Sequence, residues 1–467
     1  MGSSYYTQGE TKIRPGVYKR RSADGGFAVV STRNGIGVIA LKADWGPLNE
    51  AIAFSGTNAA DEIVSTFGNG GGIPSALAFL NAGLNTIYIY RVGEGGAPAS
   101  VELQTGVTVS AKYPGTRELS LTVRDSLRNS GSKELLVIEG DTVRQTVTFT
   151  SQASEMKTAL DEAGSEYITV TVSTDGAVEN VSQKALTGGE DPVVENESYA
   201  AAFNDTETTA YNVITIDTHE NDVKGLLANY VERADSIGKH VIAVIGDNTG
   251  VAFDTRCANA KAYNRENIAY VGGGYTNSDG EQVGAATGDT RPIAAVAGYI
   301  AACDSTGSIV HQSVKGAVNI YEKLNDSQYN QAIQSGLIMF SKSSDGIVWI
   351  DSGVNTLTSP STDQDDGWKK IKRVKIRYEL YDRLDRTLEP LSGQVNGTSD
   401  GCGIITQAGQ KVIDEMVKEQ KLISGTFSLN SSTPDSAWYD VSVVDPDTLE
   451  KIYLHYHFRY SQDTSEE

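Results

Sequence analysis

The segment YNVITIDTHENDVKGLLANYVERADSIGKHVIAVIG, Tyr211–Gly246, decides the fold class of this chain. The apolar runs VITI at its start and VIAVI at its end are typical of buried strands. Between them, Asp222 is a candidate helix cap and Gly238 a candidate helix stop. A strand, a helix and a second strand in this order predict two parallel strands joined by a crossover helix.

The same alternation of strands and helices recurs on both sides of this segment. Buried-type strands are expected in GIGVIALKADWG (Gly35–Gly46) and NTIYIYRV (Asn85–Val92), and later in NIAYVGGG and GIVWIDSG. Helical stretches such as IPSALAFLNAG and RPIAAVAGYIAACDS separate them. We therefore expect an α/β core with a mostly parallel sheet and helices on both faces, formed by residues 31–96 and 193–353.

A strand-rich block interrupts this core. Between the Gly-rich GEGG and the acidic TGGEDP, the chain reads ELSLTVRD, KELLVIEGD, VRQTVTFTS and YITVTVSTDG, with one helix around 154–163. Period-two alternation such as Leu119, Leu121, Val123 is typical of strands with one buried face. We expect residues 97–192 to form a small β-rich domain inserted between two strands of the core.

The type of structure changes again after Gly353. WKKIKRVKIRYELYDRLDRTLEPL has apolar residues at three–four spacing and predicts a long amphipathic helix, and TQAGQKVIDEMVKEQKLISG predicts a second one. The strands AWYDVSVVD and EKIYLHYHFRY follow, joined by a turn at DPDT. Residues 354–448 are thus expected to be an α+β domain.

The two ends of the chain carry strands without an obvious partner. In LEKIYLHYHFRY, apolar or aromatic residues alternate with polar, charged or aromatic ones, and only SQDTSEE follows (residues 449–467). At the other end, IRPGVY lies in a polar arm, residues 1–30. A strand with one apolar face is an aggregation hazard unless something covers it. The residues expected to carry the pairing are Ile13, Val17, Tyr18, Ile452, Leu454, Tyr456 and Phe458.

Composition excludes several classes of protein. The 467 residues carry a net charge of −21, which disfavours nonspecific binding to nucleic acid or anionic membranes. No apolar run is long enough to cross a bilayer, and the start of the chain lacks the apolar core of a signal peptide, so we expect either a cytoplasmic protein or export without such a signal. The three cysteines lie far apart and form no C-x-x-C pair.

Candidates for chemistry are few. His219, followed by Glu220, comes directly after a strand, where α/β enzymes keep catalytic groups, but a loop residue before a helix is the simpler interpretation. His455 and His457 lie two apart on a strand beside Lys451 and Arg459, which disfavour a metal. The glycine clusters FGNGGGIP and VGGGYTNSDG lack the phosphate-loop signatures, and TDQDDGW lacks the calcium-loop spacing. We therefore predict no catalytic, cofactor or metal site.

One charged segment stands out in this acidic chain. KKIKRVKIR holds six cations in nine residues, among them Lys369, Lys372 and Arg373. It is either the exposed face of an amphipathic helix or a patch that contacts another acidic subunit.

Taken in order along the chain, these segments resemble contractile tail sheath proteins of myophages and phage-like particles. The resemblance begins with IRPGVY, continues through GVIALKADWGPLNEAIAFSG and FGNGGGIPSALAFLNAGLNTIYIYRV, and ends with SAWYDVSVVDPDTLEKIYLHYHF. Each motif is short, so their order is the stronger signal. The resemblance implies a non-catalytic core of subtilisin-like fold, an outer inserted domain, and terminal arms that add strands to the C-terminal domains of neighbouring subunits.

The resemblance also implies a function. Such subunits form stacked hexameric rings around an inner tail tube, contact baseplate and tail terminator proteins, and contract to drive the tube through a target envelope. Assembly in the cytoplasm of a bacterial host is expected, without nucleic acid, membrane insertion or cofactor. A helix of the C-terminal domain faces the tube in this family, and Gln410–Leu422 is the candidate here, with Lys411, Asp414, Glu415, Lys418 and Lys421 expected to be exposed. The basic segment is its competitor for that role.

Three alternatives stay open at this point. The two terminal strands pair within their own subunit, or the chain is an α/β hydrolase or transferase with a β insert, or it is a surface adhesin, which the missing export signal disfavours. The sequence also does not distinguish a phage from a headless bacteriocin or a domesticated injection system.

Overall fold

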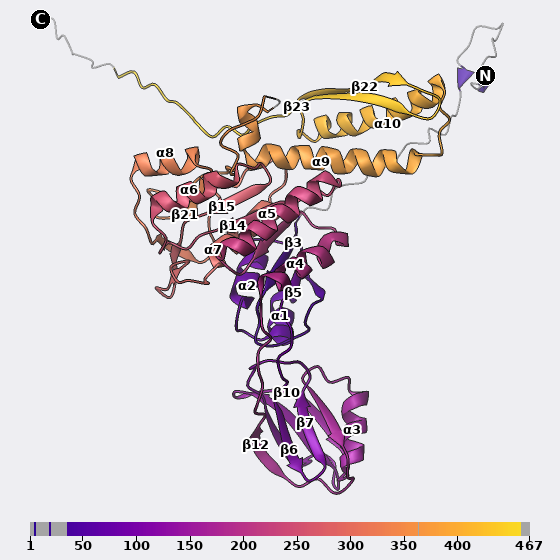
Figure 1. Ribbon diagram of the computed structural model, residues 1–467, viewed down its shortest axis with the longest axis vertical. Helices are drawn as coiled ribbons and strands as arrows, with labels where there is room; N and C mark the ends of the chain where they lie inside the picture. The colour runs from indigo at the N-terminus through magenta and orange to yellow at the C-terminus, as the bar shows by residue number, and fades with distance from the viewer. Residues whose placement is uncertain (1–3, 6–17, 20–34, 363, 459–467) are drawn as a thin grey trace, which may run out of the picture. The chain divides into compact units, whose positions relative to one another are not determined.

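The computed structural model describes residues 4–5, 18–19, 35–362 and 364–458. The described residues form two compact units, and each is treated by itself below. The larger unit comprises residues 35–376 and 447–458, and the smaller one comprises residues 4–5, 18–19 and 377–446. Figure 1 shows the elements that make up each unit.

A seven-stranded sheet organises the larger unit, in the order β19-β15-β14-β13-β3-β5-β4. Every neighbouring pair is parallel except β4–β5, so the prediction of a mostly parallel sheet is confirmed. The strands are β3 (Ile36–Leu41), β4 (Ala51–Ser55), β5 (Thr86–Arg91), β13 (Val213–Ile216), β14 (Ile242–Gly246), β15 (Ile268–Val271) and β19 (Leu337–Ile338).

Helices cover both faces of this sheet. The side chains of Ile214 and Ile216 pack with α4 and α5, and the opposite face of β13 contacts α7 because successive side chains alternate. Gly298 lets α7 pack tightly, since a Cβ there would lie 2.4 Å from the Cβ of Ala82. The helices are α1 (Ala59–Phe67), α2 (Ile73–Asn81), α4 (Asn196–Asp205), α5 (Asn221–Ser236), α6 (Phe253–Tyr263), α7 (Arg291–Ala302) and α8 (Asp326–Gln334).

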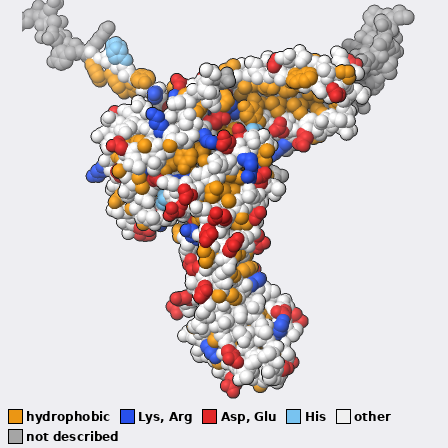
Figure 2. Space-filling view, viewed as in Figure 1, with side chains coloured by type: hydrophobic (Ala, Val, Ile, Leu, Met, Phe, Trp, Pro, Cys, Tyr) orange, Lys and Arg blue, Asp and Glu red, His pale blue; other side chains and the backbone are white. Residues whose placement is uncertain are grey.

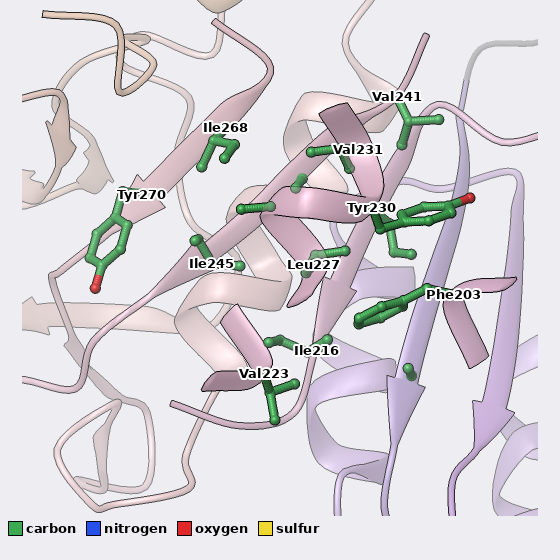
Figure 3. Close-up of a cluster of buried hydrophobic side chains, with 14 of the residues drawn as sticks. Phe203, Ile216, Val223, Leu227, Tyr230, Val231, Val241, Ile245, Ile268 and Tyr270 are labelled. Atoms are coloured by element: carbon green, nitrogen blue, oxygen red, sulfur yellow. The ribbon is translucent and has the colours of Figure 1, made fainter. Parts of the chain in front are cut away.

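The core on the α4–α5 face of the sheet is drawn in Figure 3. Leu227 and Val231 of α5 are fully buried against the sheet, and Phe203 of α4 stacks on Tyr230 with ring centroids 5.7 Å apart. Burying a side chain of this size contributes roughly 1.5–3 kcal/mol. The segment that decided the fold class thus forms the centre of the core.

The inserted segment folds into two antiparallel sheets of its own, β10-β9-β8-β12 and β11-β7-β6. Its buried residues form a separate hydrophobic cluster, which also includes Trp45 from the loop after β3. The helix expected around residues 154–163 is confirmed as α3. The elements are β6 (Ser100–Gln104), β7 (Val107–Ala111), β8 (Ser120–Asp125), β9 (Lys133–Glu139), β10 (Thr142–Phe149), α3 (Ala153–Glu162), β11 (Ile168–Val172) and β12 (Val181–Ala185).

Short antiparallel strands complete the larger unit: β16 (Tyr275–Asn277), β17 (Gln282–Val283), β18 (Ala317–Ile320), β20 (Phe340–Lys342) and β21 (Val348–Ile350). The long helix α9 (Ile371–Leu388) leads from the larger unit into the smaller one. Among the described residues, no helix is both long and apolar enough to span a bilayer.

In the smaller unit, α10 (Ser399–Lys418) packs against a hairpin of β22 (Ser424–Ser432) and β23 (Ala437–Val444). Gly409 makes this packing possible, since a Cβ there would lie 2.6 Å from the ring of Phe427. The helix begins before the predicted stretch, which started at Thr406, and the Thr398 hydroxyl caps the amide of Gly401. Two further short strands, β1 (Ser4–Tyr5) and β2 (Tyr18–Lys19), pair in parallel.

The C-terminal end of the chain differs from the expectation. Residues 449–458 form no strand, and β23 pairs with β22 rather than with the terminal segment. The hairpin predicted across DPDT is therefore wrong. β22 was missed because SGTFSLNSS is mostly polar, and the terminal segment forms no strand because it has no strand to pair with in the described part of a single chain.

Candidate assembly surface

The hairpin β22–β23 is a two-stranded sheet with both outer edges unpaired within the described residues. Its inner side is anchored by Phe427, which is 5% exposed and stacks on Tyr439 with centroids 5.0 Å apart. Leu429 and Val441 remain 40% and 42% exposed. Figure 2 shows hydrophobic side chains gathered over the hairpin and α10. Among the described residues, this sheet therefore has two strands only.

The two edges of the hairpin are not equivalent. The Gln410 side chain donates to the carbonyl of Gly425 (3.2 Å) and accepts from the amide of Phe427 (2.8 Å). These backbone groups of β22 are therefore already bonded from α10. The β23 edge has no comparable cover among the described contacts, so it is the more open of the two for an added strand.

The described part of the C-terminal arm, residues 447–458, carries exposed apolar residues of the kind that an added strand would bring to this sheet. Ile452, Leu454, Tyr456 and Phe458 are between 67% and 91% exposed. The rings of Tyr456 and Phe458 stack 6.1 Å apart, and those of His455 and His457 lie 4.1 Å apart. Rings two residues apart that face each other in this way show the period-two alternation predicted from the sequence.

The N-terminal candidates are only partly within the described residues. Tyr18 lies in β2, and its backbone pairs with Ser4 of β1. Ile13 and Val17 lie outside the described residues.

Only two of the five charges expected to be exposed on Gln410–Leu422 are exposed. Asp414 and Lys418 are exposed, and Lys411 and Glu415 are half-buried. Lys421, expected on the same exposed face, is buried instead. Its amine lies 2.7 Å from Glu379, a residue only 5% exposed, which also binds Arg383.

The basic segment is largely occupied by contacts within the chain. Lys369 pairs with Asp366 at 2.8 Å, and Arg373 lies 3.4 Å from Asp365. Lys372 is only 7% exposed, and burial lowers the pKa of its amine. Lys375 donates to the carbonyls of Ile300 and Cys303 at the end of α7. Only a small part of this positive charge therefore faces solvent. The segment offers a neighbouring subunit less exposed positive charge than its composition suggests.

His219, the candidate for enzymatic chemistry, lies beside a closed polar network. Its Nδ1 accepts from the amide of Gly288 at 3.4 Å, and burial together with the nearby Lys224 lowers its pKa to about 4. Lys224 bonds to Asp247 (2.6 Å) and to the hydroxyl of Tyr270 (3.1 Å), so the groups that would activate a catalyst are already paired. The described residues contain no cluster of metal-ligating side chains.

Comparisons with known proteins give matches of sequence and of fold. Residues 193–356 match the family described as phage tail sheath protein central domain, a family of structural proteins. No curated protein matches the sequence.

Solved structures extend the likeness over most of the chain. The sheath tail protein of Desulfitobacterium hafniense is 18% identical, with a TM-score of 0.72 over 92% of this chain and 100% of that one. The sheath tail protein of Listeria innocua is 19% identical, with a TM-score of 0.67 over 89% and 96%.

A more distant match is the contracted PVC sheath complex of an extracellular contractile injection system, 10% identical with a TM-score of 0.55 over 97% and 99%. The resemblance drawn from the sequence motifs is thereby confirmed. Residues 193–356 thus match the central domain of phage tail sheath proteins, and most of the chain has a fold similar to that of tail sheath proteins.

Proposed function

We propose that this chain is the repeating subunit of a contractile sheath, which polymerises helically with copies of itself in a phage-like particle. One observation carries the proposal: the described part of the chain has both a hairpin whose β23 edge is unpaired and an exposed apolar arm that forms no strand. The unpaired β23 edge of one copy accepts the arm of the next copy as an added strand. This head-to-tail contact does not close on itself, so it propagates as a helix.

The finer parts of the proposal follow from the resemblance. The C-terminal arm adds to the β23 edge of a neighbour, and the N-terminal arm with Ile13, Val17 and Tyr18 makes a second connection. The core is subtilisin-like in fold and carries an outer β-rich domain, and the C-terminal domain is α+β. The sheath assembles in a bacterial cytoplasm around an inner tube, between a baseplate and a tail terminator.

The tube-facing surface is assigned to α10 rather than to the basic segment. Asp414 and Lys418 are exposed, whereas Lys372 is buried and Lys369 and Arg373 have carboxylate partners within the chain. Charges of both signs on an exposed helix suit a polar contact that slides or releases during contraction, because no single strong pair has to break.

The mechanism needs no cofactor or nucleotide. Two packings of the same subunits differ in free energy, and the assembled sheath is held in the higher one until a trigger at the baseplate releases it. The subunits then move as nearly rigid bodies, while the exchanged strands keep neighbours attached.

The test is electron microscopy of the purified chain, intact and ended after Thr448. We expect tubes from the intact chain and none from the shortened one. The double variant Ile452→Lys with Leu454→Lys should also abolish tubes, because it charges the apolar face of the arm. Tyr453→Lys, on the opposite face and 88% exposed, is the matched control and should still form tubes. Tubes from the shortened chain would refute the role of this arm.

A further inference from the structure

We propose that Lys370 fastens the root of the C-terminal arm to the α/β core unit, so that strand exchange pulls on the core and not on the hairpin that precedes the arm. This inference rests on the proposed function, in which the arm is the tether. Lys370 binds two carboxylates of the root at once: its Nζ lies 2.6 Å from Asp447 Oδ2 and 2.9 Å from Glu450 Oε2.

The backbone beneath Lys370 is firmly held by the core. Lys370 forms an antiparallel bridge with Val354, and the amide of Ile371 donates to the carbonyl of Gly353 at 3.0 Å. The side chain of Asn355, 1% exposed, donates to the carbonyl of Trp368 at 2.7 Å. A force applied to Lys370 therefore reaches the last core segment before α9 through several backbone bonds.

Charge favours this attachment. Burial opposes the positive charge of Lys370, but its hydrogen bonds to Asp447 and Glu450 outweigh that cost and raise its pKa. Lys372 is buried nearby and is attracted by the same two carboxylates. Because the Lys370 side chain is 28% exposed and its amine is shared by two partly covered carboxylates, the contact is stronger than an isolated surface pair.

The root of the arm also belongs to the same compact unit as the core. The smaller unit ends at Pro446, and Asp447 begins the segment that belongs to the larger unit. The basic segment noted in the sequence thus serves, in part, as a socket for the acidic root of the arm. The apolar part of the arm begins at Ile452, just beyond Glu450, so the hinge of the tether lies at about Lys451.

Digestion with a glutamyl endopeptidase tests the attachment in the full-length chain. This enzyme must take the Glu450 side chain into its own pocket, so the ion pair with Lys370 has to open before the bond to Lys451 is cut. In Lys370→Gln we expect this cut to be about three- to tenfold faster, the factor expected for a partly covered ion pair. Mass spectrometry of the released C-terminal peptide gives the rate.

Arg373→Gln is the matched control, because it removes from the same segment a cation that pairs with Asp365. It should leave the rate of cutting unchanged. An unchanged rate in Lys370→Gln, or an equal rise in both variants, would overturn the inference. Circular dichroism of both variants is the check that they are folded.

Tube formation separates this inference from the proposed function. Lys370→Glu should repel both carboxylates and reduce the yield of tubes, and adding Asp447→Lys and Glu450→Lys should restore it. If the wild-type chain forms no tubes while the cut still accelerates in Lys370→Gln, the sheath function fails and the attachment stands. If tubes form but the cut is unaffected, the attachment alone fails.

Discussion

At the scale of single residues, polar groups buried in the core contribute to the stability of the fold. Lys224 is 1% exposed and Asp247 6%, and their 2.6 Å ion pair is completed by Asn259, which donates to Asp247 at 2.8 Å. Removing one partner of a buried pair typically costs about 3–5 kcal/mol, a large fraction of the roughly 5–15 kcal/mol by which domains are stable. His219 lies beside this network, and burial together with the charge of Lys224 lowers its pKa and so disfavours its protonation.

His219 therefore predicts a dependence of stability on pH. Its pKa is about 4 in the folded chain and about 6.5 when unfolded, so the unfolded state binds more protons between these values. Stability should fall as pH drops from about 6.5 towards 4, by about 1 kcal/mol at pH 5 after partial exposure is discounted. In His219→Gln this part of the fall should vanish. Urea unfolding at pH 7 and pH 5 measures it.

The exposed His455→Asn is the control for this prediction and should lose stability on acidification as the wild type does. A wild type and a His219→Gln variant with parallel pH profiles would contradict the prediction.

Residue-level expectations failed where partners come from distant parts of the chain. Lys421 looked exposed because it continues the polar face of a helix, but that helix ends at Lys418 and Lys421 turns inward to Glu379. The basic segment likewise looked like a free patch, while its partners Asp447 and Glu450 follow it by some eighty residues. A local sequence pattern indicates which residues face solvent. It does not show which charged residue from a distant part of the chain lies beside them.

At the scale of elements, the parallel strands were predictable and the hairpin was not. β13 and β14 are fully buried, and strands covered on both faces read as unbroken apolar runs. β22 has one buried residue, Phe427, in nine, so its sequence gives little sign of a strand. The arm shows the reverse case, because its alternation is clear although the described residues 449–458 form no strand.

The connection between the inserted domain and the core leads to a prediction at this scale. Glu94 and Val193 form a pair with two backbone hydrogen bonds, of 2.9 and 3.0 Å, so the insert enters and leaves through one antiparallel stem. Replacing residues 95–192 by Asn-Gly should close this stem as a two-residue hairpin and leave tube formation intact.

One core residue has to change with the deletion. Trp45 is 1% exposed because it packs in the insert, with its ring 5.4 Å from that of Tyr113. The deletion alone should lower the soluble yield, and Trp45→Ser in addition should recover it. Electron microscopy and the soluble fraction measure both effects. Loss of tubes from the folded double change would show that the insert is needed for assembly.

At the scale of the whole molecule, the charge of −21 opposes assembly, because every added subunit brings the same sign. Raising the salt from 0.1 to 1 M shortens the screening length from about 10 to about 3 Å. We therefore expect the protein concentration needed for tubes to fall several-fold over this range, as measured by sedimentation.

The chain ended after Thr448 is the control for salt, since it should stay in the supernatant throughout and so exclude simple salting-out. A concentration requirement that rises with salt would indicate that contacts between opposite charges, rather than apolar strand exchange, dominate assembly.

The stem formed by Glu94 and Val193 also makes this protein a scaffold for engineering. The Cα atoms of such a hydrogen-bonded antiparallel pair lie about 5.5 Å apart. Any independently folding module whose own ends are equally close, such as a small antibody-like domain or a fluorescent reporter, fits between these two residues without stretching the sheet of the core. In a polymer built from one repeated chain, a single genetic graft at this position would display the module at regular intervals along the whole filament.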